Sequence, residues 1–92
     1  MTIREPKKIP KQDSNEEVLE EKFLILHNDD VHTFDYVIDA LIEICEHNYE
    51  QASQCTFLVH YKGKCDVRKG SRDELKPMKD ALLERELNAT ID

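Results

Sequence analysis

The sequence predicts one small α+β domain with the element order β-α-α-β-α-β, in which three helices pack on one face of a three-stranded antiparallel sheet. The chain has 92 residues, which is enough for a single domain. Short apolar runs alternate along it with longer segments whose apolar residues recur every three or four positions. Each of these longer segments begins after a residue type that commonly caps helices. No internal repeat is visible.

Residues 1–21 are expected to form a flexible N-terminal extension, and residues 22–92 to form the folded core. The first eleven residues contain two prolines and four basic residues, whereas residues 13–21 are mostly acidic. Such a composition buries too little apolar surface to offset the entropy cost of ordering the chain. A solvated arm and a docking or delivery segment are both compatible with this pattern.

The first strand and the first helix follow from consecutive patterns. The apolar run Phe23–His27 predicts a strand, and residues 28–32 predict a loop. Thr33 is suited to cap the helix that follows. One face of that helix is apolar, with side chains at spacings of three and four: Phe34, Val37, Ile38, Leu41, Ile42 and Cys45.

The second helix is expected between Asn48 and Gly63. Asn48 followed by Gln51 resembles a capping box, and Gly63 is placed as a C-cap glycine would be. The buried stripe of this helix contains Ala52, Cys55, Thr56 and Val59. Apolar and polar residues then alternate over residues 64–69, which predicts a strand.

The third helix is expected to begin at a capping box made by Ser71 and Glu74 and to end near Glu86. Its apolar stripe contains Leu75, Met78 and Leu82. Pro77 conflicts with a regular helix interior, so we expect either a kink or a main helix that starts at this proline. Residues 87–91 predict the last strand.

The composition limits the classes of function. A formal net charge of -7 disfavours a nucleic-acid backbone or an anionic membrane as partner. No apolar run is long enough to span a bilayer, and no signal-peptide pattern is present. We therefore expect a soluble cytoplasmic protein.

The cysteines predict neither a disulfide framework nor a metal site. Cys45, Cys55 and Cys65 lie within apolar patterns, and none forms a close pair such as C-x-x-C. Cys45 and His47 are two positions apart, but nothing completes a ligand set. We expect free thiols that behave as small hydrophobic groups in a reducing compartment, and no bound metal or other cofactor.

The chain is not expected to be an enzyme. Asp30 and His60 could pair as acid and base, and any cysteine could be offered as a nucleophile. None of these residues lies in a nucleophile elbow or a phosphate-binding loop. A small hydrolase or a metal-dependent enzyme is therefore the weaker alternative to a binding protein.

The most informative stretch is Asn28-Asp29-Asp30, three polar residues between the first strand and the first helix. Residues of these types commonly form turns and cap helices, and a histidine such as His60 near a helix end is commonly a surface residue. An amide oxygen, a carboxylate and a neutral imidazole nitrogen could equally each accept a hydrogen bond from one ammonium group. The residue types alone favour the turn, cap and surface roles over the binding role.

Four segments carry a family resemblance: Leu26-His27-Asn28-Asp29-Asp30, Phe34-Asp35-Tyr36-Val37-Ile38-Asp39, Ala52-Ser53-Gln54 and Val59-His60-Tyr61-Lys62-Gly63-Lys64. In this order and spacing they resemble the ClpS family, the adaptor proteins of the bacterial N-end rule pathway. The resemblance runs without gaps over residues 24–64 and more loosely to the end of the chain. It implies an adaptor that binds proteins with a bulky hydrophobic N-terminal residue. It also implies delivery of these proteins to a Clp-type AAA+ unfoldase paired with the ClpP peptidase.

The resemblance further implies roles for individual residues. Asn28, Asp30 and His60 would hold the α-amino group of the substrate, with Asp29 beside them. The pocket for the first side chain would be lined by His32, Phe34, Val37, Thr56, Val59 and Asn88. Asp73 matches an acidic position of the surface that docks on the N-domain of the unfoldase. The adaptor would be a monomer without a cofactor.

Four pocket positions depart from the usual family pattern. His32 replaces a threonine, Phe34 and Thr56 replace methionines, and Asn88 falls near a position usually taken by leucine. The wall is therefore expected to be more polar and less adaptable than usual. Leu, Phe, Tyr and Trp remain the expected first residues of the substrate. A more polar wall favours Tyr or Trp among them, because their O–H or N–H group needs a hydrogen-bond partner. In the alternative, the pocket no longer binds N-degrons, and the protein only docks on the unfoldase and modulates its substrate choice.

Overall fold

The computed structural model describes residues 20–92 and confirms the predicted α+β fold and order of elements. The elements are β2 (Lys22–His27), α2 (Phe34–Cys45), α3 (Tyr49–Lys62), β3 (Lys64–Gly70), α4 (Arg72–Glu84) and β4 (Asn88–Ile91). Of the predicted extension, residues 1–21, all but Glu20 and Glu21 lie outside the described residues.

The sheet has the strand order β3-β2-β4, and both pairings of β2 are antiparallel. Leu24 and Leu26 of β2 point into the core, where they are almost fully buried. Leu24 pairs with Arg68 and Ile25 pairs with Asp66, so Val67 is an extra residue that forms a β-bulge in β3. The bulge lets Val67 pack in the core while the next residue, Arg68, donates a hydrogen bond to the carbonyl oxygen of Cys45 at 3.2 Å.

All three helices begin at the caps that the sequence predicts. The Thr33 hydroxyl accepts a hydrogen bond from the Tyr36 amide at 3.2 Å, which caps α2. Reciprocal capping boxes start α3, at Asn48 and Gln51, and α4, at Ser71 and Glu74. These bonds satisfy amide groups that the first turn of a helix leaves without partners.

Helix α4 runs through Pro77 and ends slightly earlier than predicted. It starts at Arg72, so the expectation that the helix might begin at Pro77 is wrong. Pro77 is exposed, and so is Asp73, whose carbonyl would otherwise accept the bond that a proline cannot donate. The helix ends at Glu84, two residues before the predicted end, and Glu86 then takes a positive φ of 65°.

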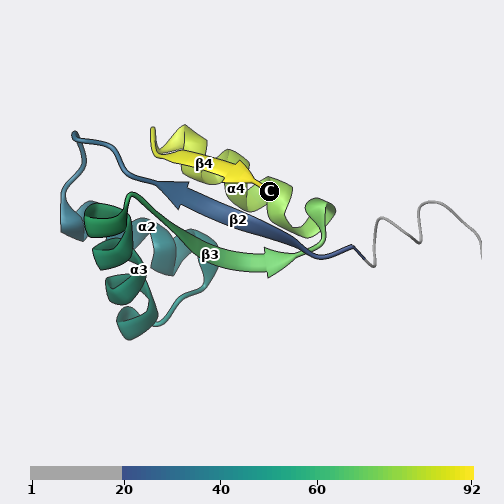
Figure 1. Ribbon diagram of the computed structural model, residues 1–92, viewed down its shortest axis with the longest axis horizontal. Coiled ribbons are helices and arrows are strands. Elements are labelled where there is room, and N and C mark those ends of the chain that lie inside the picture. The colour runs from purple at the N-terminus through teal and green to yellow at the C-terminus, as the bar shows by residue number, and fades with distance from the viewer. Residues whose placement is uncertain (1–19) are drawn as a thin grey trace, which may run out of the picture.

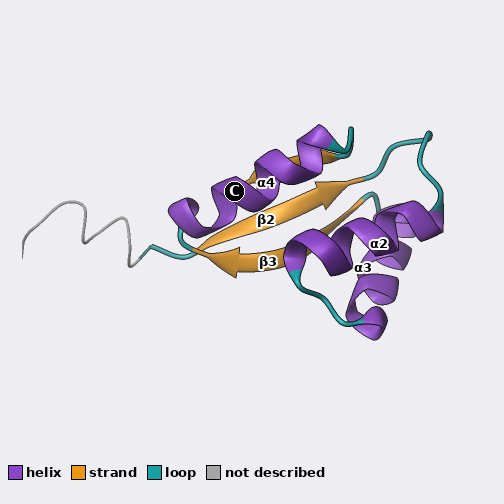
Figure 2. Ribbon diagram, turned by 180° about the vertical axis from the view of Figure 1, so that it is seen from behind, coloured by secondary structure: helices purple, strands orange, loops and turns teal. Residues whose placement is uncertain are grey.

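The core lies between the sheet and the helices. Figure 1 shows the sheet in front of α4, and Figure 2, seen from behind, shows α4 in front of the sheet. Helices α2 and α3 pack on each other near the end of the sheet where β2 ends (Figure 1). The loop between them is fixed by the buried His47, whose Nε2 donates to the carbonyl oxygen of Val67 at 2.6 Å. This packing places the loop after β2 beside the last turns of α3.

Candidate functional site

One backbone hydrogen bond joins the two parts of the candidate site. The Asn28 amide, directly after β2, donates to the carbonyl oxygen of Gly63 at 2.9 Å. Gly63 ends α3 in the left-handed region, with φ of 97°, where a residue with a Cβ would be strained. The bond therefore brings Asn28 close to the last turn of α3, which carries His60.

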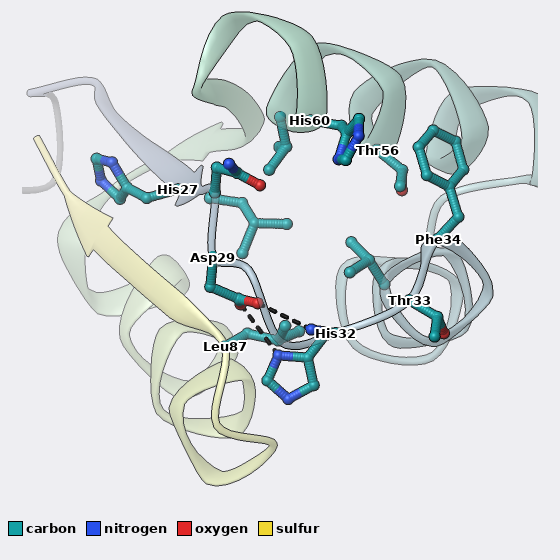
Figure 3. A pocket seen from close by; sticks show the side chains of 12 residues that line it. His27, Asp29, His32, Thr33, Phe34, Thr56, His60 and Leu87 are labelled. Atoms are coloured by element: carbon teal, nitrogen blue, oxygen red, sulfur yellow. Dashed lines mark hydrogen bonds and ion pairs between the residues drawn. The ribbon is translucent and has the colours of Figure 1, made fainter.

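The Asp29 carboxylate organises the loop that follows. Its Oδ1 accepts hydrogen bonds from the amides of Val31, at 2.8 Å, and His32, at 3.0 Å. Its Oδ2 lies 3.0 Å from Nδ1 of His32. Figure 3 shows the two contacts between Asp29 and His32, to the amide and to the ring, as dashed lines. Burial raises the pKa of Asp29, but the bonds from His32 and Val31 outweigh burial, so this pKa lies below its usual value. Asp29 is thus held as an anion at the edge of the pocket.

A small pocket lies between this loop, α2 and α3. Its lining residues are Leu26, His27, Asn28, Asp29, His32, Thr33, Phe34, Val37, Thr56, Val59, His60 and Leu87. Figure 3 shows Asp29, Phe34, Thr56 and His60 around a common hollow. The site therefore combines side chains from segments that are far apart in the sequence.

The floor of the pocket is buried and mostly apolar, whereas its rim is exposed. Val37, Thr56 and Val59 are between 3% and 8% exposed. Asn28, Phe34 and His60 are exposed at the rim. The rings of Phe34 and His60 meet edge to face, with centroids 5.7 Å apart and planes inclined by 74°.

Two of the polar substitutions affect the wall less than the sequence indicates. The Thr56 hydroxyl donates to the carbonyl oxygen of Ala52 at 2.7 Å, so its proton is already used within α3. The His32 ring bonds to Asp29 and stacks on Tyr36, with centroids 4.6 Å apart and planes inclined by 18°. The polar groups of the pocket are therefore concentrated at Asn28, Asp29 and His60.

Most of the sequence-predicted site residues line this one pocket. The exceptions are Asp30, which is exposed, Asn88 and Asp73. Asn88 is the first residue of β4, where it pairs with His27 and is exposed. Its neighbour Leu87, which is 3% exposed, lines the pocket instead.

Three further lining residues were missed by sequence reasoning, namely Leu26, His27 and Thr33. Leu26 and His27 were placed in the first strand and in a segment of the family resemblance, and Thr33 at a helix cap. No sequence signal indicates that these positions also line the pocket. Figure 3 shows His27 pointing away from the hollow, and its Nε2 lies 2.8 Å from the Thr90 hydroxyl. Asp73 lies in the first turn of α4 and is exposed there.

The chemistry of the pocket suits a cation attached to an apolar group. An amide, a carboxylate and an imidazole supply acceptors on the loop and on the last turns of α3. Within the part of the chain that the structure describes, no lysine or arginine lines the pocket. Among residues 20–92, no group of three or more His, Cys, Asp or Glu side chains could hold a metal ion. Within the same residues, no helix is both long enough and apolar enough to cross a bilayer.

Comparisons with known proteins agree with this fold. The family model of the ATP-dependent Clp protease adaptor protein ClpS matches residues 20–90. The ATP-dependent Clp protease adapter protein ClpS of Campylobacter jejuni strain 81-176 is 48% identical over 40 residues, and so is that of C. jejuni subsp. doylei. These matches cover 44% of this chain and 42% of each relative, so they span less than half of the relatives' length.

A solved structure extends the likeness to most of the chain. The structure of Agrobacterium tumefaciens ClpS2 bound to L-phenylalaninamide superposes with a TM-score of 0.67 and covers 78% of this chain and 94% of that one. The two sequences are 20% identical, so this likeness concerns the fold. Because the family model matches well over half of the residues, the chain belongs to the ClpS family of ATP-dependent Clp protease adaptor proteins.

Proposed function

We propose that this protein is an adaptor that binds proteins through a bulky hydrophobic N-terminal residue and its free α-amino group, and delivers them to a Clp AAA+ unfoldase. The observation that carries the proposal is the juxtaposition of Asn28, Asp29 and His60 with an apolar-floored pocket. The ligand of the Agrobacterium relative, L-phenylalaninamide, has a free amino group next to an aromatic side chain, which supports this assignment.

The amino group would be held at the polar side of the pocket. An ammonium ion donates three hydrogen bonds, and the Asn28 oxygen, the Asp29 carboxylate and an unprotonated nitrogen of His60 can accept one each. Hydrogen bonds that involve an ion contribute about 1.5–3 kcal/mol each. Asp30, one residue beyond the lining, would add to the negative charge of this loop.

The side chain of the first residue would enter the hollow beside this grip. Full burial of a Leu or Phe side chain contributes roughly 1.5–3 kcal/mol. Added to the amine contacts and reduced by the cost of association, this is consistent with micromolar affinity. The side-chain subsite is assigned to His32, Phe34, Val37, Thr56, Val59 and Leu87, with Leu87 taking the position first given to Asn88.

The remaining parts of the proposal concern the partner and the setting. The adaptor would act as a cytoplasmic monomer, with residues 22–92 as its core and residues 1–21 as the extension that assists delivery. Asp73, exposed at the start of α4, would contribute to docking on the N-domain of the unfoldase. The protein would perform no catalysis and use no cofactor.

The proposal is tested by following degradation of a fluorescent protein that begins with Phe, using a Clp unfoldase and ClpP from the same organism. We expect this protein to accelerate degradation, and we expect the His60→Ala variant to lose most of that effect. The same substrate with Glu placed before the Phe is the matched control and should not respond. If the Phe substrate is unaffected while other substrates are degraded at altered rates, the protein only modulates the unfoldase and the N-degron assignment is wrong.

A further inference from the structure

Two cysteines that do not line the pocket lie close together between α3 and β3. Cys55 belongs to α3 and Cys65 is the second residue of β3. The carbonyl oxygen of Asp66 lies 4.0 Å from the sulfur of Cys55 and 3.4 Å from the sulfur of Cys65. Both side chains pack on the edge of the core and are partly exposed. One oxygen atom thus has both thiols as neighbours.

Cys45 provides an internal contrast. It is fully buried in the core at the end of α2, and burial raises the pKa of its thiol to about 11. A thiol in this environment is protonated and shielded from solutes, so it reacts slowly. Any thiol oxidation among the described residues is therefore expected at Cys55 and Cys65.

The two neighbouring thiols differ from each other in acidity. Their mutual hydrogen bond lowers the pKa of Cys55 and raises the pKa of Cys65. Because the thiolate is the nucleophile in thiol oxidation, the direction of these shifts makes Cys55 the group expected to react first. Cys65 would then act as the resolving thiol.

We propose that Cys55 and Cys65 form a redox modification site at which hydrogen peroxide or an organic hydroperoxide produces a reversible disulfide between α3 and β3. In the first step the Cys55 thiolate attacks one peroxide oxygen, the O–O bond breaks, and Cys55 becomes a sulfenic acid as hydroxide leaves. In the second step the Cys65 sulfur attacks the Cys55 sulfur, the S–S bond forms, and the sulfenic oxygen leaves as water with the thiol proton. Overall, two thiols and one hydrogen peroxide yield one disulfide and two waters; with an organic hydroperoxide the first leaving group is an alkoxide, and the products are one disulfide, one alcohol and one water.

The bridge would act on the helix that carries part of the pocket. Thr56, Val59 and His60 follow Cys55 on α3, so the disulfide would fasten this helix to β3, an edge strand of the sheet. Closing a loop of this size restricts the unfolded chain, and we expect the thermal midpoint to rise by about 10 °C on oxidation.

The test treats the full-length reduced protein with one equivalent of hydrogen peroxide and measures its intact mass, free thiols and peptide map. The mass should fall by two hydrogen atoms, one of the three thiols should remain free, and a peptide linking Cys55 to Cys65 should appear. Dithiothreitol should reverse all three changes. Cys45→Ala is the matched control and should form the same bridge.

The two remaining variants separate the steps. Cys65→Ser should stop at a Cys55 sulfenic acid that dimedone labels, whereas Cys55→Ser should remain unmodified under the same dose. Three free thiols after treatment, a bridge that involves Cys45, or a disulfide only between two molecules would overturn the proposal. None of these readouts depends on peptide binding, so a failure here leaves the proposed adaptor function untouched.

Discussion

At the scale of single residues, the site depends on where acceptor atoms are still available. Asp29 uses both carboxylate oxygens on the loop, whereas the exposed His60 has no polar partner among the described residues beyond ring contacts with Phe34 and Tyr61. Among the described residues, His60 and the side-chain oxygen of Asn28 are therefore acceptors that a substrate amine can engage without displacing an existing bond. The His60 ring also contacts the ring of Phe34 at the rim, so His60 lies between the polar and the apolar parts of the pocket.

Replacing His60 should weaken binding of peptides with a free N-terminal Phe. His60→Ala removes one acceptor for an ammonium group, which corresponds to about a tenfold to hundredfold loss of affinity. His60→Gln keeps an oxygen acceptor and should recover part of this loss. Gln54→Ala, an exposed change on the same helix, is the control for fluorescence anisotropy titrations. An unchanged affinity of His60→Ala would remove His60 from the site.

The assignment of Leu87 rather than Asn88 to the pocket makes a second residue-scale prediction. Leu87 is 3% exposed, so Leu87→Ala should lower the free energy of unfolding by about 2–5 kcal/mol. Asn88 is exposed, and Asn88→Ala should change it by less than about 0.5 kcal/mol. Urea denaturation measures both values. Without urea, Asn88→Ala should bind Phe peptides with the same affinity as the parent protein. A loss of affinity would show that Asn88 belongs to the pocket lining.

At the scale of elements, signals that act over three or four residues were predictable and longer-range effects were not. The predicted capping boxes at Asn48 and Ser71 are confirmed. They were predictable because each is complete within one helical turn. The β-bulge at Val67 was not predicted, because an alternating pattern gives no indication of an extra residue in one strand. The start of β4 was placed one residue early, at Leu87 instead of Asn88. Separately, the family resemblance, which is loose in this part of the chain, placed Asn88 in the pocket lining where the structure has Leu87.

The end of α2 carries a pH-dependent contribution to stability. Burial raises the pKa of Cys45 from 9.0 to about 11, so the unfolded chain ionises first as the pH rises. The stabilisation is complete below about pH 9 and is lost as the pH passes through about 11. It corresponds to about 2–3 kcal/mol in the free energy of unfolding.

Denaturation curves at pH 8, 9, 10 and 11 measure this contribution. The protein should lose stability across this range, and Cys45→Ala, although less stable at pH 8, should lose less. The difference between the two curves isolates Cys45 from lysines, tyrosines and the other cysteines. Parallel curves for the two proteins would show that the thiol ionises equally in the folded and unfolded chains.

At the scale of the whole molecule, the fold brings together the loop after β2 and the end of α3, which are more than thirty residues apart in the sequence. The sequence predicted the grouping of Asn28 and His60 only through the family resemblance, because composition and spacing left His60 as an ordinary surface histidine. The hydrogen bond from Asn28 to Gly63 is the physical link that no local pattern indicates. The contact between Cys55 and Cys65 was unpredictable for the same reason, since it exists only once α3 packs on β3.

The central claim is that a free α-amino group and its neighbouring apolar side chain are recognised together. Isothermal titration of this protein with a short peptide beginning with Phe, compared with the same peptide acetylated at its N-terminus, tests it most directly. Acetylation removes the positive charge and two of the three donors, so we expect micromolar binding of the free peptide and a loss of affinity of at least about a hundredfold on acetylation. Equal affinities for the two peptides would contradict the account.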